Sequence, residues 1–303
     1  MTGGNWQKTL SAPALFKGVG LHSGKSVELT VSPAPGDAGI VFLRRDLMNG
    51  DARKNRAAKI LANPDNVIRA DHGTTIANGQ GAYVSTVEHL MAALALCGVD
   101  NAVIDLVGPE VPILDGSASA FVAGICAKGL KTLPETRRDI DIDHPISVVE
   151  GDRFISIEPA AARKLSVTID FPDCFIGRQS IVLDLEDPGF IDRIASARTF
   201  CRLDEVETLR QMGLIRGGSM DNAIVVDGER ILNDQPLRDE REFALHKALD
   251  LIGDLYLLGA PIRGAIRAHK PGHDLNTRAA LAVARAAAGV REPMAAAEHA
   301  VVA

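Results

Sequence analysis

The hydrophobic pattern of the first half of the chain changes from short strand-like runs to a helical pattern. Residues 25–31 alternate in polarity and residues 39–44 form a short β-type run, both bounded by Gly, Pro and Asp, which predicts two strands. Residues 85–97 are rich in strong helix formers and are followed by a glycine, so they predict a helix. A further strand is expected at 101–107 and a second helix at 118–129.

The second half repeats this order of strands first and helices later. Residues 134–139, a proline followed by a charged run, are the expected linker. The elements expected beyond it are strands at 145–149, 153–157, 164–171 and 179–185, a helix at 203–212, a glycine turn at 217–218, a strand at 223–227, a helix at 239–258, a strand at 264–268 and a helix at 275–288. The pattern therefore predicts an α+β fold with two domains, 1–133 and 134–303.

Composition and charge narrow the class of protein. Of the 303 residues, 46% are hydrophobic, and 33 basic against 39 acidic side chains leave a net charge of −6. This balance gives no electrostatic reason to bind nucleic acid or an anionic membrane. The chain shows no signal peptide and no run of about 18 apolar residues, so we expect a cytoplasmic protein without stable membrane insertion. We also expect a monomer with four free cysteines, because no two of them form a C-x-x-C pair.

The segment from Ser85 to His89 has two interpretations. Ser85 and Glu88 have the spacing of a capping box, in which Glu88 only closes the start of a helix. The apolar residues 90–93 that follow indicate a buried helix, and Glu88 and His89 would then be ionisable groups in need of partners. This segment alone favours capping and leaves a functional role open.

A second group of polar residues lies within the helix expected at 239–258. His246, Asp250 and Asp254 repeat every four residues, so they share one stripe of a helix that is otherwise almost all apolar, with Lys247 beside the stripe. A histidine and an aspartate at this spacing can present two metal ligands from one face, as the histidines of H-E-x-x-H do. A plain row of ion pairs is the alternative, since charged pairs at this spacing are common.

Two histidines near the C-terminal end are rival candidates for a catalytic group. Pro271 and Gly272 predict a turn that places His273 just before the last helix, on a loop of the kind that often carries catalytic residues. His269 precedes this turn, which makes it the weaker candidate. A solvated histidine without function is the alternative for both.

Combined, these groups hold the parts of a hydrolytic metal site. His89, His246 and Asp250 supply three nitrogen and oxygen ligands without sulfur, which is the ligand count of a catalytic zinc site, and the same set also suits iron(II). Glu88 could take a proton from a water molecule and His273 could donate one to a leaving group. The alternative class is a binding module whose buried histidines and aspartates form only an ion-pair network.

Short motifs in chain order resemble the UDP-3-O-acyl-N-acetylglucosamine deacetylases, zinc enzymes of the committed step of lipid A synthesis in Gram-negative bacteria. The motifs are GVGLHSG at 18–24, STVEHLMAA at 85–93, VPILDGS at 111–117, ARTF at 197–200, GGS at 217–219, HKALDLIGD at 246–254 and KPGH at 270–273. The resemblance covers nearly the whole chain. Several motifs in register are far more specific than any one of them.

The resemblance implies a role for each matching residue. Those implied to bind the zinc are His89, His246 and Asp250. Glu88 is implied as the general base and His273 as the general acid, with Asp254 supporting the charged form of His273. Lys247 is implied to assist in substrate binding and electrostatics, and Thr199 to stabilise the oxyanion.

The resemblance also implies a substrate and a fold. The substrate is a UDP-linked, 3-O-acylated N-acetylglucosamine, whose acetamide is hydrolysed to an amine and acetate; a zinc amidohydrolase acting on an acylated amine without the nucleotide is the alternative. The fold is two similar domains, each a β-sheet layered with helices, with the active site between them and an insert that forms an acyl passage. We expect Phe200 and Ser219 to contact the substrate and the apolar residues 169–176 to form part of the passage. Arg202 and residues 71–75 depart from the family pattern near these contacts.

Overall fold

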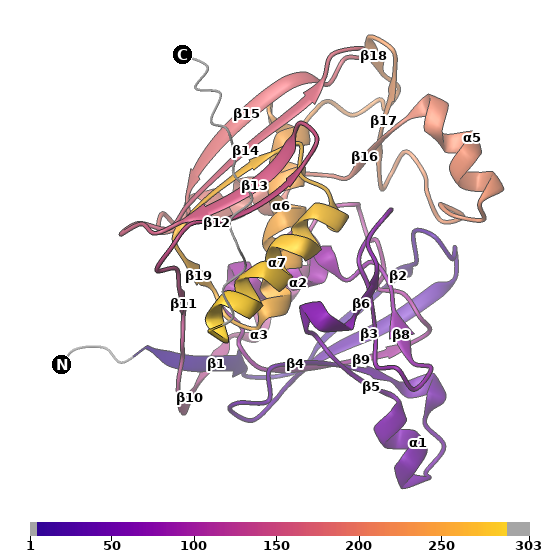
Figure 1. Cartoon of the computed structure of the whole chain (residues 1–303). Helices are drawn as coiled ribbons and strands as arrows, with labels where there is room; N and C mark the ends of the chain where they lie inside the picture. Colours follow the sequence, from indigo (N-terminus) through magenta and orange to yellow (C-terminus); the bar gives the residue numbers. More distant parts are fainter. Residues whose placement is uncertain (1–4, 290–303) are drawn as a thin grey trace.

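Two five-stranded sheets dominate the computed structural model, which describes residues 5–289 (Figure 1). The first sheet consists, in spatial order, of β2 (Ala14–Val19), β3 (Ser26–Pro33), β9 (Ala102–Val107), β4 (Ile40–Arg44) and β5 (Lys59–Leu61). The second consists of β12 (Ile146–Glu150), β13 (Arg153–Glu158), β20 (Ala265–His269), β14 (Lys164–Phe171) and β15 (Gly177–Asp184).

The two sheets have the same topology. From one edge to the other, the pairings in each are antiparallel, antiparallel, parallel and antiparallel. In both, the strand that comes last in the chain, β9 or β20, takes the central position. The expectation of an α+β fold with two similar halves is therefore confirmed, although the sequence shows no residue-level repeat.

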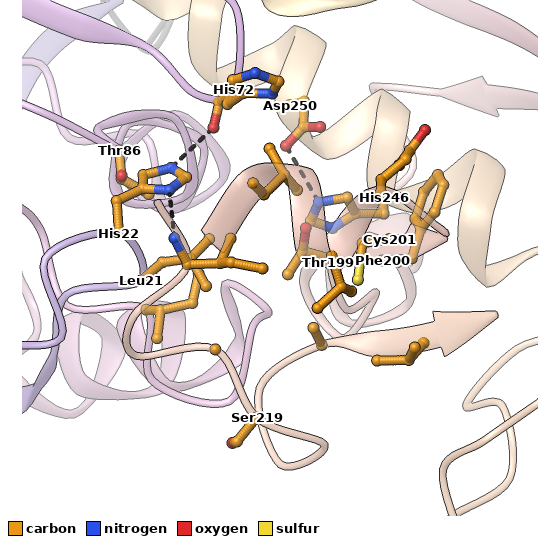
Figure 2. Close-up of a pocket in the computed structure, with 18 of the residues that line it drawn as sticks. Leu21, His22, His72, Thr86, Thr199, Phe200, Cys201, Ser219, His246 and Asp250 are labelled. Atoms are coloured by element: carbon orange, nitrogen blue, oxygen red, sulfur yellow. Dashed lines mark hydrogen bonds and ion pairs between the residues drawn. The ribbon is translucent and has the colours of Figure 1, made fainter. Parts of the chain in front are cut away.

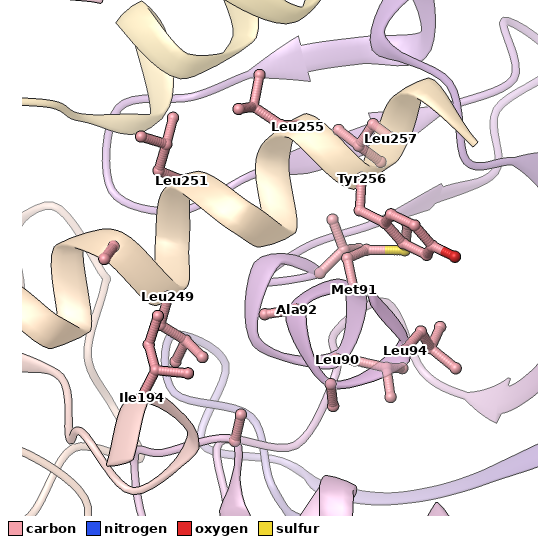
Figure 3. Packing of buried hydrophobic residues seen from close by; sticks show 14 of the residues in the cluster. Leu90, Met91, Ala92, Leu94, Ile194, Leu249, Leu251, Leu255, Tyr256 and Leu257 are labelled. Carbon is pink, nitrogen blue, oxygen red and sulfur yellow. The ribbon is translucent and has the colours of Figure 1, made fainter. Parts of the chain in front are cut away.

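Four helices lie between the two sheets (Figure 1). They are α2 (Glu88–Cys97), α3 (Ser119–Lys128), α6 (Glu242–Leu255) and α7 (His273–Ala287). In each half one helix precedes the central strand and one follows it. Both α2 and α6 are apolar around most of their circumference, and they are buried because they pack against each other as well as against their surroundings. Figure 3 shows side chains of both helices within one hydrophobic cluster.

The remaining elements are short and connect or flank this core. They are β1 (Trp6–Leu10), α1 (Ala52–Ala57), β6 (Val67–Arg69), β7 (Thr75–Ala77), β8 (Tyr83–Val84), β10 (Leu130–Thr136), β11 (Ile140–Asp141), α4 (Phe190–Ala195), β16 (Phe200–Arg202), α5 (Leu203–Gln211), β17 (Ile224–Asp227), β18 (Arg230–Ile231) and β19 (Ile262–Arg263), with 3₁₀ turns at Arg45–Leu47, Pro64–Asn66 and Tyr256–Leu258. The four cysteines are free. Within the described residues, no helix has the length and apolar character that crossing a membrane requires.

The segment expected to be a linker begins as a strand. Residues 134–136 belong to β10, which pairs antiparallel with β1 near the N-terminus. Pro134 is compatible with this position because the sheet has only two strands, so each strand has an unpaired edge. The boundary between 133 and 134 falls inside β10 and stays a prediction.

The two halves approach each other closely at Gly253 of α6. A Cβ at this position would lie 2.0 Å from the carbonyl oxygen of Glu88 and 3.1 Å from the backbone nitrogen of Ala92, both in α2. These distances are far inside van der Waals contact, so only glycine allows the two helices to lie this close. The contact holds the first turn of α2 against α6.

We predict that Gly253→Ala destabilises the protein. Helix propensity alone predicts a gain of about 1 kcal/mol for this change, whereas the clash with Glu88 predicts a loss of about 1–3 kcal/mol in the free energy of unfolding. Chemical denaturation of both proteins measures the sign. A more stable variant would show that the helices do not need this close approach.

Candidate active site

Glu88 and His89 are the first two residues of α2, and both side chains are buried. The capping interpretation is wrong, because Val87 is the N-cap residue and no side chain caps the helix. The Glu88 carboxylate instead accepts a hydrogen bond of 2.9 Å from the backbone N–H of Thr74. Burial raises the pKa of Glu88. A carboxylate with a raised pKa accepts a proton more readily, as a general base must.

The described structure brings His89 of the first half next to His246 and Asp250 of the second. Asp250 Oδ1 lies 3.5 Å from His89 Nε2 and 3.4 Å from His246 Nε2. One nitrogen or oxygen atom from each of the three residues lies within 4.8 Å of the others. Residues 89 and 246 are more than 150 positions apart in the sequence, and the contact between α2 and α6 brings them together in space.

The chemistry of these three side chains fits a metal cation. Asp250 Oδ1 is buried and has no hydrogen-bond partner in the described structure, which is costly for a carboxylate oxygen unless a cation occupies the space beside it. His246 Nδ1 donates to the carbonyl of Ala197 at 3.0 Å, so its Nε2 carries a lone pair toward Asp250. Burial lowers the pKa of His246 to about 3, which argues against a row of ion pairs with a charged histidine.

Asp254 and His273 form a hydrogen-bonded pair beside this cluster. His273 Nδ1 donates to Asp254 Oδ2 at 2.8 Å, and Asn276 Nδ2 donates to the same oxygen at 2.9 Å. Burial by itself lowers the pKa of His273, but the negative charges of Asp254 and Asp250 outweigh it and raise the pKa to about 10. His273 therefore carries a positive charge and can donate a proton from its other ring nitrogen.

His273 was expected on the loop just before the last helix, but it is the first residue of that helix. Gly272 is extended and acts as the N-cap of α7. The rival His269 lies in β20, where its ring stacks on Phe154 with centroids 5.8 Å apart. A cavity of about 420 Å³ beside the cluster of His89, His246 and Asp250 is lined by His273 but not by His269.

Thr74 connects the two acid–base groups and was missed in the sequence. Its backbone N–H holds Glu88, while its hydroxyl donates to Asp254 Oδ1 at 2.5 Å and lies 3.4 Å from His273 Nδ1. The side chain is fully buried. Thr74 lies in the segment 71–75, which differs from the family pattern, and no sequence motif there indicates this role.

A cavity of about 420 Å³ opens next to the cluster (Figure 2). Its polar end contains Glu88, His89, His246, Asp250 and His273. Its other end is mostly apolar. There the insert between β15 and α6 supplies two charged residues, Glu205 and Arg210, and the apolar residues Leu203, Val206, Leu209, Ile215, Met220 and Val225. The cavity therefore suits a molecule with a polar group at one end and an apolar chain at the other.

The other expected substrate residues occupy different parts of this cavity. Thr199 and Phe200 line it close to His246, and Lys247 Nζ lies 5.5 Å from the centre of the Phe200 ring (Figure 2). Lys247 Nζ also donates to Asp250 Oδ2 at 2.9 Å. Ser219 lies on an exposed turn far from the cluster in Figure 2, where its hydroxyl accepts from the backbone N–H of Asp221.

The expected contribution of residues 169–176 to the apolar passage is wrong. None of them lines the large cavity; Ile169 and Phe171 line a separate cavity of about 240 Å³ instead. This second cavity is also lined by Arg153, Lys247 and Lys270 and by one acidic residue, Asp170, so basic side chains outnumber acidic ones on its wall.

Residues that depart from the family pattern lie around the cavity. His72 lines it, and its carbonyl accepts a hydrogen bond of 2.9 Å from His22 Nε2 (Figure 2). His22 also lines the cavity, although the sequence indicates no role for it beyond its place in the motif at 18–24. Arg202 points elsewhere and forms an ion pair with Asp204.

Two histidines and a carboxylate, flanked by a second carboxylate and a charged histidine, are the groups that metal-assisted hydrolysis requires. The sequence profile of the family described as LpxC, UDP-3-O-acyl N-acetylglycosamine deacetylase, matches residues 7–285. The chain therefore belongs to the UDP-3-O-acyl N-acetylglycosamine deacetylase family.

Individual relatives match over almost their whole length. The chain is 47% identical over 279 residues to the UDP-3-O-acyl-N-acetylglucosamine deacetylase of Phenylobacterium zucineum, which covers 92% of this chain and 93% of that protein. It is 48% identical over 270 residues to the protein of the same name from Myxococcus xanthus, with 89% and 83% covered. For that of Saccharophagus degradans the identity is 46% over 277 residues, with 91% and 89% covered.

We predict that His246→Ala loses a bound divalent metal while His269→Ala keeps it. Changes to residues that only support a metal ligand cost about 10–100-fold in affinity, so removal of a ligand should cost more. Metal analysis of the purified, untagged proteins measures this. Equal metal content in the two variants would contradict the proposed ligand set.

Proposed function

We propose that this chain hydrolyses the acetamide of UDP-3-O-(3-hydroxyacyl)-N-acetylglucosamine to a free amine and acetate, the committed step of lipid A synthesis. The observation that carries the proposal is the buried, unpartnered Asp250 oxygen between His89 and His246, with Glu88 and His273 on either side. Membership in the deacetylase family supports the same reaction.

The proposed cofactor is one zinc ion held by His89, His246 and Asp250, with iron(II) as the other ion that this donor set suits. When bound, such an ion would polarise the acetamide carbonyl and lower the pKa of a water molecule. The hydrogen bond from His246 Nδ1 to Ala197 fixes the tautomer that the ligand role needs.

The residues of the chain divide the proton transfers between them. Glu88 takes a proton from the attacking water, and its raised pKa suits it to that role. His273, held in its charged form by Asp254, donates a proton to the departing amine, which is otherwise a poor leaving group. Thr199 would stabilise the negative charge that develops on the carbonyl oxygen.

The two cavities give the substrate a direction. The 3-O-acyl chain would lie along the apolar part of the insert, and the sugar would pack near Phe200, whose ring centre lies 6.2 Å from that of His246. The basic cavity with Arg153, Lys247 and Lys270 would receive the diphosphate. Lys247 lines both cavities, so it would contact the substrate where the sugar joins the nucleotide. Ser219 would contact only the far end of the acyl chain.

The protein has a net charge of −6, which by itself would not attract an anionic substrate. The local group of basic side chains in this cavity would hold the anion instead. A cytoplasmic location and a monomeric state stay predictions from the sequence.

We predict that Glu88→Gln lowers kcat for acetate release about 10²–10⁴-fold, because the amide cannot accept the proton, while metal content stays unchanged. Acetate release is measured with the UDP-linked substrate and with the same acylated sugar without UDP, before and after treatment with a chelator. The matched control is Glu205→Gln, an exposed residue of α5 that lines the apolar end of the same cavity. Two results would contradict the proposal: acetate release that persists after treatment with the chelator, or acetate release that is equally fast with and without the UDP group.

We predict that Asp254→Asn moves the basic limb of the pH profile of kcat/KM to lower pH. His273 works in its protonated form, so activity is lost as the pH rises through its pKa. Loss of the Asp254 charge lowers that pKa, and activity is then lost at a lower pH than in the unchanged enzyme. A basic limb that stays in place, with metal content and circular dichroism intact, would remove Asp254 from this role.

A further inference from the structure

A third cavity lies at the opposite end of the α2–α6 pair from the metal ligands. It has a volume of about 150 Å³ and is lined by the C-terminal ends of both helices, through Ala95, Leu96, Ile252 and Leu255. Eight residues separate Glu88 from Leu96 along α2, which corresponds to roughly 12 Å of helix. No residue lines both this cavity and the large one, so the site is separate from the active site.

Both halves of the protein contribute to the wall, and most of it is apolar. Besides the helix ends, Leu185, Phe190, Tyr256, Pro261, Ile262 and Ile266 face the space. The volume of about 150 Å³ is enough for a benzene-sized group. The wall therefore suits a short hydrocarbon.

Two arginines line this wall, Arg137 and Arg163. The buried Nε of each has no hydrogen-bond partner in the described residues, and only Arg137 has an ion pair, to Asp100. Burial lowers the pKa of the Arg163 guanidinium, which shows that the surroundings oppose its charge. An unpaired buried donor of a charged group costs free energy that a hydrogen-bonded anion would recover.

The other charges near the cavity do not supply that anion. Arg137, the second arginine on the wall, lies 2.8 Å from Asp100 and is balanced by it. Asp139 attracts Arg163 electrostatically, but its carboxylate forms its ion pair with Arg263, at 2.9 Å. Glu186 also attracts Arg163, and no ion pair between the two is formed in the described residues. Arg163 is therefore attracted by Asp139 and Glu186 but forms no ion pair with any of the described residues.

We propose that this cavity binds a small monocarboxylate with an apolar tail, such as a short-chain fatty acid, with the carboxylate on Arg163 and the tail between α2, α6 and Phe190. The carboxylate accepts a charge-assisted hydrogen bond from the guanidinium of Arg163, and the tail fills the apolar space. A phosphate would leave the apolar wall empty, and a neutral hydrocarbon would leave the Arg163 donor unpaired. Because residues of both halves line the cavity, the bound acid stabilises their packing.

The test measures binding of hexanoate and of hexanamide, its uncharged counterpart, to the metal-loaded full-length protein by calorimetry and by the shift in Tm. Hexanoate should bind saturably and raise Tm. Arg163→Met keeps most of the apolar stem and removes the charge, so hexanoate should bind at least about tenfold more weakly while hexanamide changes little. Arg267→Met, an exposed residue of β20 that does not line the cavity, is the matched control.

A second variant separates this site from the large cavity and does not depend on Arg163. Ala95→Phe places a ring into the apolar space and should abolish binding of hexanoate. The Tm of each variant without ligand shows whether it folds. If Arg163→Met does not fold, the binding of hexanoate to Ala95→Phe tests the proposal by itself. Absence of saturable binding, or hexanoate binding that neither variant changes, overturns the proposal, the latter because the acid would then occupy another site.

Discussion

Direct contact between the backbones of α2 and α6, at Glu88 and Gly253, determines where every chemical group of the site lies. His89 belongs to one half of the chain, and His246 and Asp250 belong to the other. Neither half holds all three candidate metal ligands, so the group exists only while the two helices touch. Any side chain at position 253 would separate the rings and the carboxylate that now lie 3.4–3.5 Å apart.

The same contact explains why so many ionisable groups tolerate burial in one place. Glu88, His89, His246, Asp250 and Asp254 all have little exposure to solvent. Isolated charges in such surroundings are costly, but here most of them have a partner: Thr74 and Asn276 donate to carboxylates, and Lys247 donates to Asp250. The oxygen of Asp250 that stays without a hydrogen bond marks the position at which the protein itself provides no compensation.

The sequence predicted those parts of the fold and the site that depend on regular spacing. The stripe of His246, Asp250 and Asp254 could be read because an α-helix repeats every 3.6 residues. Pairing of β1 with β10 and the short strands of the inserts could not, because they depend on contacts between distant segments and carry little local pattern. Thr74 escaped for the same reason, since its role arises only where its loop meets α6 and α7.

The inserts, rather than the repeated sheets, distinguish the two halves, and this separates two properties of the protein. Helix α5, which supplies part of the apolar wall, contains no buried residue and lies outside both five-stranded sheets. Substitutions there change the shape of the apolar end of the cavity at small cost to folding, because little of the core depends on them. The length of acyl chain that such a protein accepts can therefore drift during evolution while the ligand set on α2 and α6 stays fixed.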